Sequence, residues 1–155
     1  MFNLSKFTIS LFGIGFFPIG SGTIGSLFSI IFFFIFLDYF SITNLIFIFT
    51  LIFIFSLYAI NNYSNKIKKD DASEIIIDEF LGINLIIIFY DFITFTNDLL
   101  MCFLIFILFR IFDIIKIFPA NWIDKNIKNS WGVILDDIIA GVYTVITLYI
   151  LNAFF

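Results

Sequence analysis

Two pairs of adjacent acids interrupt apolar stretches of this sequence: Asp78 with Glu79, and Asp136 with Asp137. An ionised carboxylate in a low-dielectric setting is costly unless a cation or a metal ion accompanies it. The acids could simply pair with the basic side chains, but together with Asp113 they outnumber the basic residues nearby, which favours a bound metal. The chain has no histidine and one cysteine. The expected ion is therefore one that prefers oxygen ligands, such as Mg²⁺, Mn²⁺ or Ca²⁺, rather than zinc.

A second group of charged residues has a spacing of three: Arg110, Asp113 and Lys116. On a helix this spacing puts them on one face, close enough to form ion pairs. One interpretation is a self-neutralising stripe that lets an apolar helix tolerate charge near its end. The other is a phosphate clamp, in which Asp113 orients the two-pronged guanidinium group of Arg110. The spacing alone favours neither.

The segment 13–25 contains five glycines and a proline, which predicts a turn-rich, glycine-rich N-terminal loop. Ser21 and Thr23 are suitable N-caps for a helix that starts near Ile24. Free backbone N–H groups, two hydroxyls and a helix N-terminus could bind an anion. Close helix packing through small residues is the alternative. A Walker loop is excluded because the required lysine is missing.

The elements that must position these residues are apolar. The 155 residues are 62% apolar and only 13% charged, with a mean hydropathy of +1.14 and a net charge of −4. Such a chain has too few charges to cover the surface of a soluble domain, so we expect an integral membrane protein with no nucleic-acid partner. By length it is a single domain over 1–155. The apolar runs predict an all-α membrane bundle of four to five segments: 24–37, 42–60, 75–95, 99–118 and 133–155.

The orientation follows from the lysines. If the N-terminus is cytoplasmic and all five runs cross the bilayer, all seven lysines fall on the cytoplasmic side and the opposite loops carry no basic residue. The acid pairs, Arg110 and the glycine-rich segment then lie near the same face. We therefore expect a multi-pass membrane protein with a cytoplasmic site.

Four blocks of the sequence, in this order and spacing, resemble the phosphatidylglycerophosphatase A family: GIGFFPIGSGTIGSL, DASEIIIDEFLG, FRIFDIIKIFP and WGVILDDIIAGVY. The resemblance extends from Gly13 to about Leu151. It implies an all-helical fold and Mg²⁺-dependent hydrolysis of phosphatidylglycerophosphate in the bilayer to phosphatidylglycerol and phosphate, at the bacterial inner (cytoplasmic) membrane. Both direct attack by an aspartate and attack by a metal-bound water agree with it, as do one or two metal ions.

The resemblance also implies roles for individual residues. Four acids match those expected to bind Mg²⁺: Asp78, Glu79, Asp136 and Asp137. The residues implied in substrate binding are Gly22, Thr23, Ser26, Arg110 and Lys116. Asp113 joins the four acids, Arg110 and Lys116 in the implied catalytic set. Backbone-shaping positions depart from the family pattern: Ser21, Ala72 and Ile117 replace prolines, and Asn129-Ser130 replaces a Gly-Gly pair.

Two other functions use buried carboxylates in a membrane. A small non-enzymatic carrier should have acids distributed across the depth of the bilayer, whereas the acids here are expected at one face. A lipid-headgroup transferase would also use Mg²⁺ and acids, but its Asp-x-x-Asp-Gly run is absent.

Overall fold

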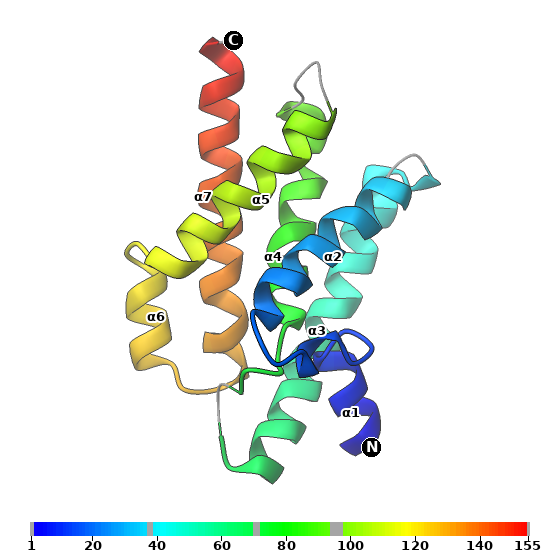
Figure 1. The fold of residues 1–155 in the computed structure, drawn as a ribbon, viewed down its shortest axis with the longest axis vertical. Coiled ribbons are helices and arrows are strands. Elements are labelled where there is room, and N and C mark those ends of the chain that lie inside the picture. Colours follow the sequence, from blue (N-terminus) through cyan, green and yellow to red (C-terminus); the bar gives the residue numbers. More distant parts are fainter. Residues whose placement is uncertain (1, 37–38, 70–71, 94–97, 155) are drawn as a thin grey trace.

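The computed structural model describes residues 2–36, 39–69, 72–93 and 98–154. These residues form helices and no strands (Figure 1), which confirms the all-α prediction for the described part of the chain. The elements are α1 (Phe2–Ile9), η1 (Ile14–Phe16), α2 (Ser21–Phe36), α3 (Ile42–Ile67), α4 (Ile77–Ile88), η3 (Tyr90–Phe92), α5 (Asp98–Ile115), α6 (Ala120–Asn126) and α7 (Ser130–Phe154).

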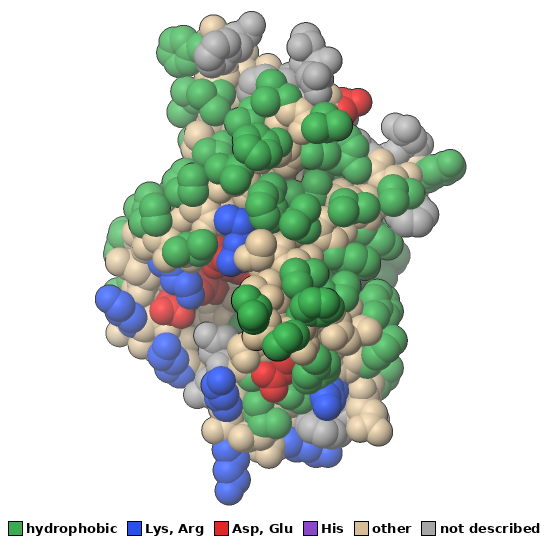
Figure 2. Space-filling view, in the orientation of Figure 1, with side chains coloured by type: hydrophobic (Ala, Val, Ile, Leu, Met, Phe, Trp, Pro, Cys, Tyr) green, Lys and Arg blue, Asp and Glu red, His purple; other side chains and the backbone are tan. Residues whose placement is uncertain are grey.

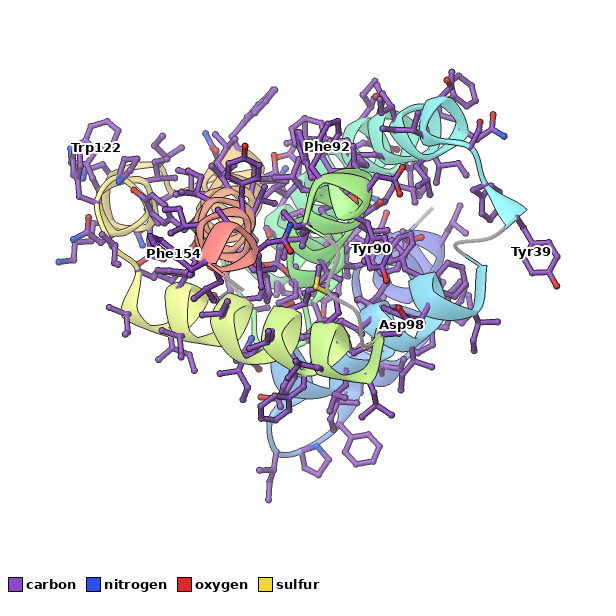
Figure 3. All side chains as sticks on the ribbon, turned by 90° about the horizontal axis from the view of Figure 1, so that it is seen from above. Tyr39, Tyr90, Phe92, Asp98, Trp122 and Phe154 are labelled. Atoms are coloured by element: carbon purple, nitrogen blue, oxygen red, sulfur yellow. The ribbon has the colours of Figure 1, made fainter. Side chains whose placement is uncertain are left out.

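Helix α4 is the centre of the bundle. It packs against α7, α2, α3 and α5, and most of its side chains are buried. Seen from above, α7 and α3 lie on either side of α4, and α2 and α5 share a third side (Figure 3). The first turn of α4 carries Asp78 and Glu79, so the acids of one pair start inside the bundle rather than on its surface.

Two glycines bring α4 and α7 into close contact. A Cβ atom on Gly82 would lie 2.8 Å from the carbonyl oxygen of Asp137, and one on Gly141 would lie 2.7 Å from the carbonyl oxygen of Gly82. Both distances are shorter than side-chain atoms tolerate, so only glycine permits this approach. The contact fixes Asp137 of α7 beside the acid-bearing turn of α4.

The glycine-rich loop is shorter than predicted. Helix α2 begins at Ser21 rather than near Ile24, so Gly22 and Gly25 are helical. A Cβ on Gly22 would overlap Glu79 Oε1, and one on Gly25 would lie 3.1 Å from Ile76 Cδ1. Packing against α4 therefore outweighs the low helix propensity of glycine. The expected end of this helix, at residues 37 and 38, lies outside the described residues.

The start of α7 is fixed by residues that depart from the family pattern. Asn129 Oδ1 accepts hydrogen bonds from the backbone N–H groups of Trp131 (3.0 Å) and Gly132 (3.3 Å). A side-chain oxygen at this position satisfies donors that have no partner inside the helix. Asn129 thus supplies an N-cap that a glycine could not, and the helix starts nearly two turns before its two aspartates.

By length and composition, two described helices, α3 and α7, are able to cross a membrane. The other expected segments fall short of the ~20 residues that span a bilayer: α2 has 16 residues and α4 has 12, and α5 carries three charged residues. Four to five crossings are thus not established. Basic side chains gather at the lower end of the molecule in Figure 2, whereas apolar side chains cover the upper part of that face.

Candidate functional site

A polar cavity of about 290 Å³ lies where the first turns of α2 and α4, the end of α5 and the start of α7 meet. In Figure 2 it is the recess in which acidic and basic side chains gather below a largely apolar surface. Its lining contains all seven of the charged residues predicted for the site: Asp78, Glu79, Arg110, Asp113, Lys116, Asp136 and Asp137. The structure therefore brings together residues separated by as many as 59 positions in sequence.

Three of these acids form what we call the acid cluster: Asp78, Glu79 and Asp137. Each offers a carboxylate oxygen, and the three oxygens lie within 4.8 Å of one another. Asp78 and Glu79 come from α4, and Asp137 comes from α7 across the close Gly82 contact. Three hard oxygen donors in this arrangement could hold a metal ion.

Two features of the chain itself fit a bound cation. The cavity is lined by five carboxylates but only two cationic side chains. In addition, Glu79 Oε2 is buried and has no hydrogen-bond partner among the described residues. Buried carboxylate oxygens normally have a partner, so a cation would supply what the protein does not.

A second group of charges is what we call the lysine bridge: Lys116 with Asp124 and Asp136, of which Lys116 and Asp136 line the cavity. Lys116 Nζ donates to Asp136 Oδ2 at 2.5 Å and to Asp124 Oδ1 at 2.9 Å. Burial lowers the pKa of Lys116, but the two hydrogen-bonded carboxylates outweigh it, so the net pKa is raised. The same hydrogen bond lowers the pKa of Asp124. Lys116 therefore stays charged and pairs with Asp136, which lines the same cavity but is not one of the three clustered acids.

This pairing corrects the expected stripe of charges on one helix face. Helix α5 ends at Ile115, and Lys116 has a positive φ of 48°. The chain turns away before the third member of the stripe, so the lysine reaches α6 and α7 instead of Asp113. Arg110 and Asp113 remain on α5 and form the predicted i,i+3 pair at 2.6 Å.

Arg110 also contacts the acid cluster. Its Nη1 lies 3.7 Å from Glu79 Oε1 in addition to the short contact with Asp113 Oδ2. The guanidinium group is thus oriented by acids from two helices and lines the cavity. This is the arrangement that the clamp interpretation requires, although the pair with Asp113 satisfies the stripe interpretation as well.

The start of α2 forms another wall. Gly22 and Thr23 line the cavity, whereas Ser26 does not: it is fully buried, and its Oγ donates to the Gly22 carbonyl at 2.9 Å. Ser21 Oγ donates to the Ser73 carbonyl at 2.7 Å, which ties α2 to the segment before α4. The glycines therefore serve close packing while leaving the first turn of α2 open to the cavity.

Sequence reasoning gave Asp124 no role. This residue contacts Lys116 from α6, eight positions further along the chain. Its acidic side chain directly before Lys125, in the polar segment that follows Lys116, was the available signal. Residues 72, 73 and 75 also line the cavity. Tyr63 anchors this segment by donating a 2.5 Å hydrogen bond to Glu74 Oε1.

The chain matches the family described as Phosphatidylglycerophosphatase A over residues 7–152. It is 33% identical over 79 residues to the Phosphatidylglycerophosphatase A of Haemophilus influenzae, which covers 51% of this chain and 46% of that protein. It is 34% identical over 82 residues to the Escherichia coli protein of the same name, covering 53% of this chain and 45% of that protein.

A third relative, from Bacteroides thetaiotaomicron, carries the provisional name of a phosphatidylinositol-3-phosphatase. The identity is 35% over 81 residues, or 51% of this chain and 48% of that protein. The matched segments thus span about half the length of these relatives. No solved structure matches the chain.

Proposed function

The chain belongs to the phosphatidylglycerophosphatase A family, and from this premise we propose that it hydrolyses phosphatidylglycerophosphate to phosphatidylglycerol. Water is consumed, the bond between phosphorus and the terminal glycerol oxygen breaks, and inorganic phosphate leaves. The observation that carries the proposal is the single cavity in which two cationic side chains face three clustered carboxylates. A carrier should have acids spread along its path, so this gathering favours an enzyme.

Arg110 and Lys116 are the phosphate-binding residues of this proposal. A phosphomonoester dianion needs positive charge on its oxygens, and a guanidinium group can offer two parallel N–H donors. Lys116, directly after the end of α5, adds a point charge. Thr23 and the backbone N–H groups in the first turn of α2 lack helical acceptors and assist. Asp113 keeps Arg110 oriented through its 2.6 Å contact.

We propose Mg²⁺ as the ion of the acid cluster, with Asp78, Glu79 and Asp137 as the residues that would hold it. Oxygen-only donors and a phosphate substrate suit Mg²⁺. The three carboxylate oxygens lie within 4.8 Å of one another, so they would offer such an ion three donors in one place. When bound, the ion would neutralise phosphate charge and activate the attacking oxygen. Asp136 would support the site through Lys116.

The proposed location is a bacterial inner membrane, with the cavity at its cytoplasmic face. Helix α3 has an apolar surface that is mostly exposed in the monomer, which a bilayer would cover. The lysines at one end of the molecule fit the cytoplasmic side. The acid-lined cavity lies between this basic end and the apolar surface (Figure 2), at the depth of a lipid headgroup.

Phosphate release in detergent tests the proposed reaction. The purified chain should release phosphate from phosphatidylglycerophosphate with Mg²⁺ and lose this activity in EDTA. Phosphatidylinositol 3-phosphate, suggested by the name of the third relative, is the matched comparison substrate. Absence of release from phosphatidylglycerophosphate at saturating Mg²⁺ would refute the proposed function, and faster release from the inositol lipid would reassign its substrate.

Cysteine labelling tests the orientation separately. Asn65 and Asn126 are exposed at the basic end, and Cys102 is the only native cysteine. In a Cys102→Ser background, cysteines at these two positions should react with a membrane-impermeant maleimide only after the inner membrane is permeabilised. Ready labelling from the periplasm would overturn the cytoplasmic location.

A further inference from the structure

An apolar groove of about 630 Å³ runs between α2 and α5. Figure 1 shows the two helices side by side in front of α4, and Figure 3 confirms that they lie on the same side of it. Apart from Asp98 at one end, its lining is apolar or weakly polar. Several of these side chains are exposed, including Ile31 at 54% and Phe103 at 59%. The polar cavity contains none of these residues, so the groove is a separate feature.

The groove begins at the polar cavity. On α2, Thr23 lies in the cavity, and Leu27, Ile30 and Phe34 of the groove follow it at intervals of four, three and four. This spacing places all four on one stripe of the helix. The α2 wall of the groove is therefore a direct continuation of the cavity wall that Thr23 forms.

Helix α5 repeats the pattern in the opposite chain direction. Leu99, Phe103 and Phe106 line the groove, and the same intervals lead to Arg110 in the cavity. Each wall of the groove thus ends at a residue proposed to hold phosphate. A molecule with a phosphate in the cavity would have its neighbouring atoms directed between these two stripes.

The dimensions fit one leaflet of a bilayer. Eleven residues separate Thr23 from Phe34 and Leu99 from Arg110, which corresponds to a rise of about 16 Å. Half of a typical hydrocarbon core is about 15 Å. The polar cavity, at about 290 Å³, is at the small end for a ligand pocket and suits a headgroup alone. The acyl chains must therefore leave it.

We propose that the groove between α2 and α5 binds an acyl chain of the phosphatidyl substrate while its phosphate lies in the cavity. This inference rests on the proposed function and adds how the lipid is oriented. A second apolar cavity, of about 480 Å³, uses Phe28, Phe32 and Phe33 of α2. Those residues lie on a different side of α2 from the Thr23 stripe, so that cavity has no comparable connection to the phosphate site.

A substitution that fills the groove tests whether the groove itself binds the acyl chain, as opposed to general contact between lipid and the apolar surface. Ile31→Trp adds bulk to the groove, and Ile54→Trp is a matched control on α3, because Ile54 is 61% exposed and lines neither apolar cavity. Ile31→Trp should lower kcat/KM for a long-chain phosphatidylglycerophosphate about tenfold. It should leave release from a water-soluble dibutyryl analogue within about twofold, and Ile54→Trp should change neither. Equal losses on both substrates, or no loss on either, would overturn the proposal.

Photocrosslinking gives a readout that does not depend on turnover. Phosphatidylglycerophosphate with a diazirine in one acyl chain, in nanodiscs, should label the peptides that contain residues 27–35 and 99–106. Ile31→Trp should reduce this labelling, and Ile54→Trp should not. Labelling spread evenly over α3 and α7, or crosslinks between two copies of the chain in place of lipid adducts, would overturn the groove assignment. Specific groove labelling without phosphate release from either substrate would instead refute the proposed function alone.

Discussion

The acid cluster and the lysine bridge are built from neighbouring aspartates but differ in charge balance: the first contains three acids, and the second contains two acids and one lysine. Asp137 meets Asp78 and Glu79, with no lysine in the group. Asp136, one position earlier, accepts a 2.5 Å hydrogen bond from Lys116. Adjacent residues on a helix point about 100° apart, since there are 3.6 residues per turn. One aspartate therefore faces α4 and the other faces the chain that follows α5.

The difference teaches where a cation is still needed. The lysine bridge contains a cation of its own, because Lys116 pairs with both Asp136 and Asp124. Among the described residues, the cation that pairs with the acid cluster is Arg110, at 3.7 Å from Glu79, and Arg110 is closer to Asp113. Substitutions that remove one charge should thus have unequal effects in the two halves of the cavity.

The largest effect is expected for Asp137→Asn, which removes one of the three clustered carboxylates while keeping its size. We predict a loss of at least about 1000-fold in kcat/KM, equivalent to about 4 kcal/mol, and a higher Mg²⁺ requirement. The melting temperature should stay level or rise, because a buried uncompensated charge is removed. Asp91→Asn, at an exposed position away from the cavity, is the control. Full activity of Asp137→Asn at limiting Mg²⁺ would contradict the metal assignment.

A smaller loss is expected for Arg110→Lys, which keeps the charge but removes the fork. Losing one charge-assisted hydrogen bond to phosphate would cost about 1.5–3 kcal/mol, or about ten- to a hundredfold in kcat/KM. Adding Asp113→Asn should not restore activity, since the clamp needs the fork rather than charge balance. Wild-type kinetics in the single variant, or recovery in the double variant, would leave Arg110 as a stripe residue only.

Asp136→Asn should cost about fivefold in kcat/KM, or about 1 kcal/mol. Lys116 would keep Asp124 as a partner at 2.9 Å, so the lysine remains charged and near its place. The Mg²⁺ dependence should stay close to wild type, in contrast to Asp137→Asn. Equal losses of activity and of Mg²⁺ affinity in the two variants would make Asp136 a metal ligand and erase the proposed division of the cavity.

The smallest effect is expected for Asp124→Asn. The side chain of Asp124 is 33% exposed, and partly exposed ion pairs contribute about 0–1 kcal/mol. We predict about a twofold loss of kcat/KM, with a larger loss when it is combined with Asp136→Asn, because Lys116 then has no carboxylate partner in the bridge. Strict additivity of the two changes, measured in a double-mutant cycle, would show that Asp124 does not act through Lys116.

Features that depend on local spacing could be predicted from the sequence. The apolar runs indicated helices, and each of the five contains one, although α4 begins after residue 76 and α5 ends at Ile115. Asp78 and Glu79 are neighbours in one turn, and the i,i+3 spacing of Arg110 and Asp113 produces their 2.6 Å pair. The orientation predicted from the lysines also put the seven charged site residues near one membrane face, because each of them lies near the start or the end of a predicted helix.

Tertiary packing decided the rest. The sequence could not tell which of two adjacent aspartates joins the acids of α4, because that depends on the approach of Gly82 and Gly141 between helices far apart in the chain. It also suggested a loop where Gly22 and Gly25 are helical against α4. Lys116 appeared to continue a stripe, but the end of α5 at Ile115 sends it to Asp124 and Asp136. Residue types and local periodicity thus determined which charges enter the cavity, whereas non-local contacts between helices determined their partners.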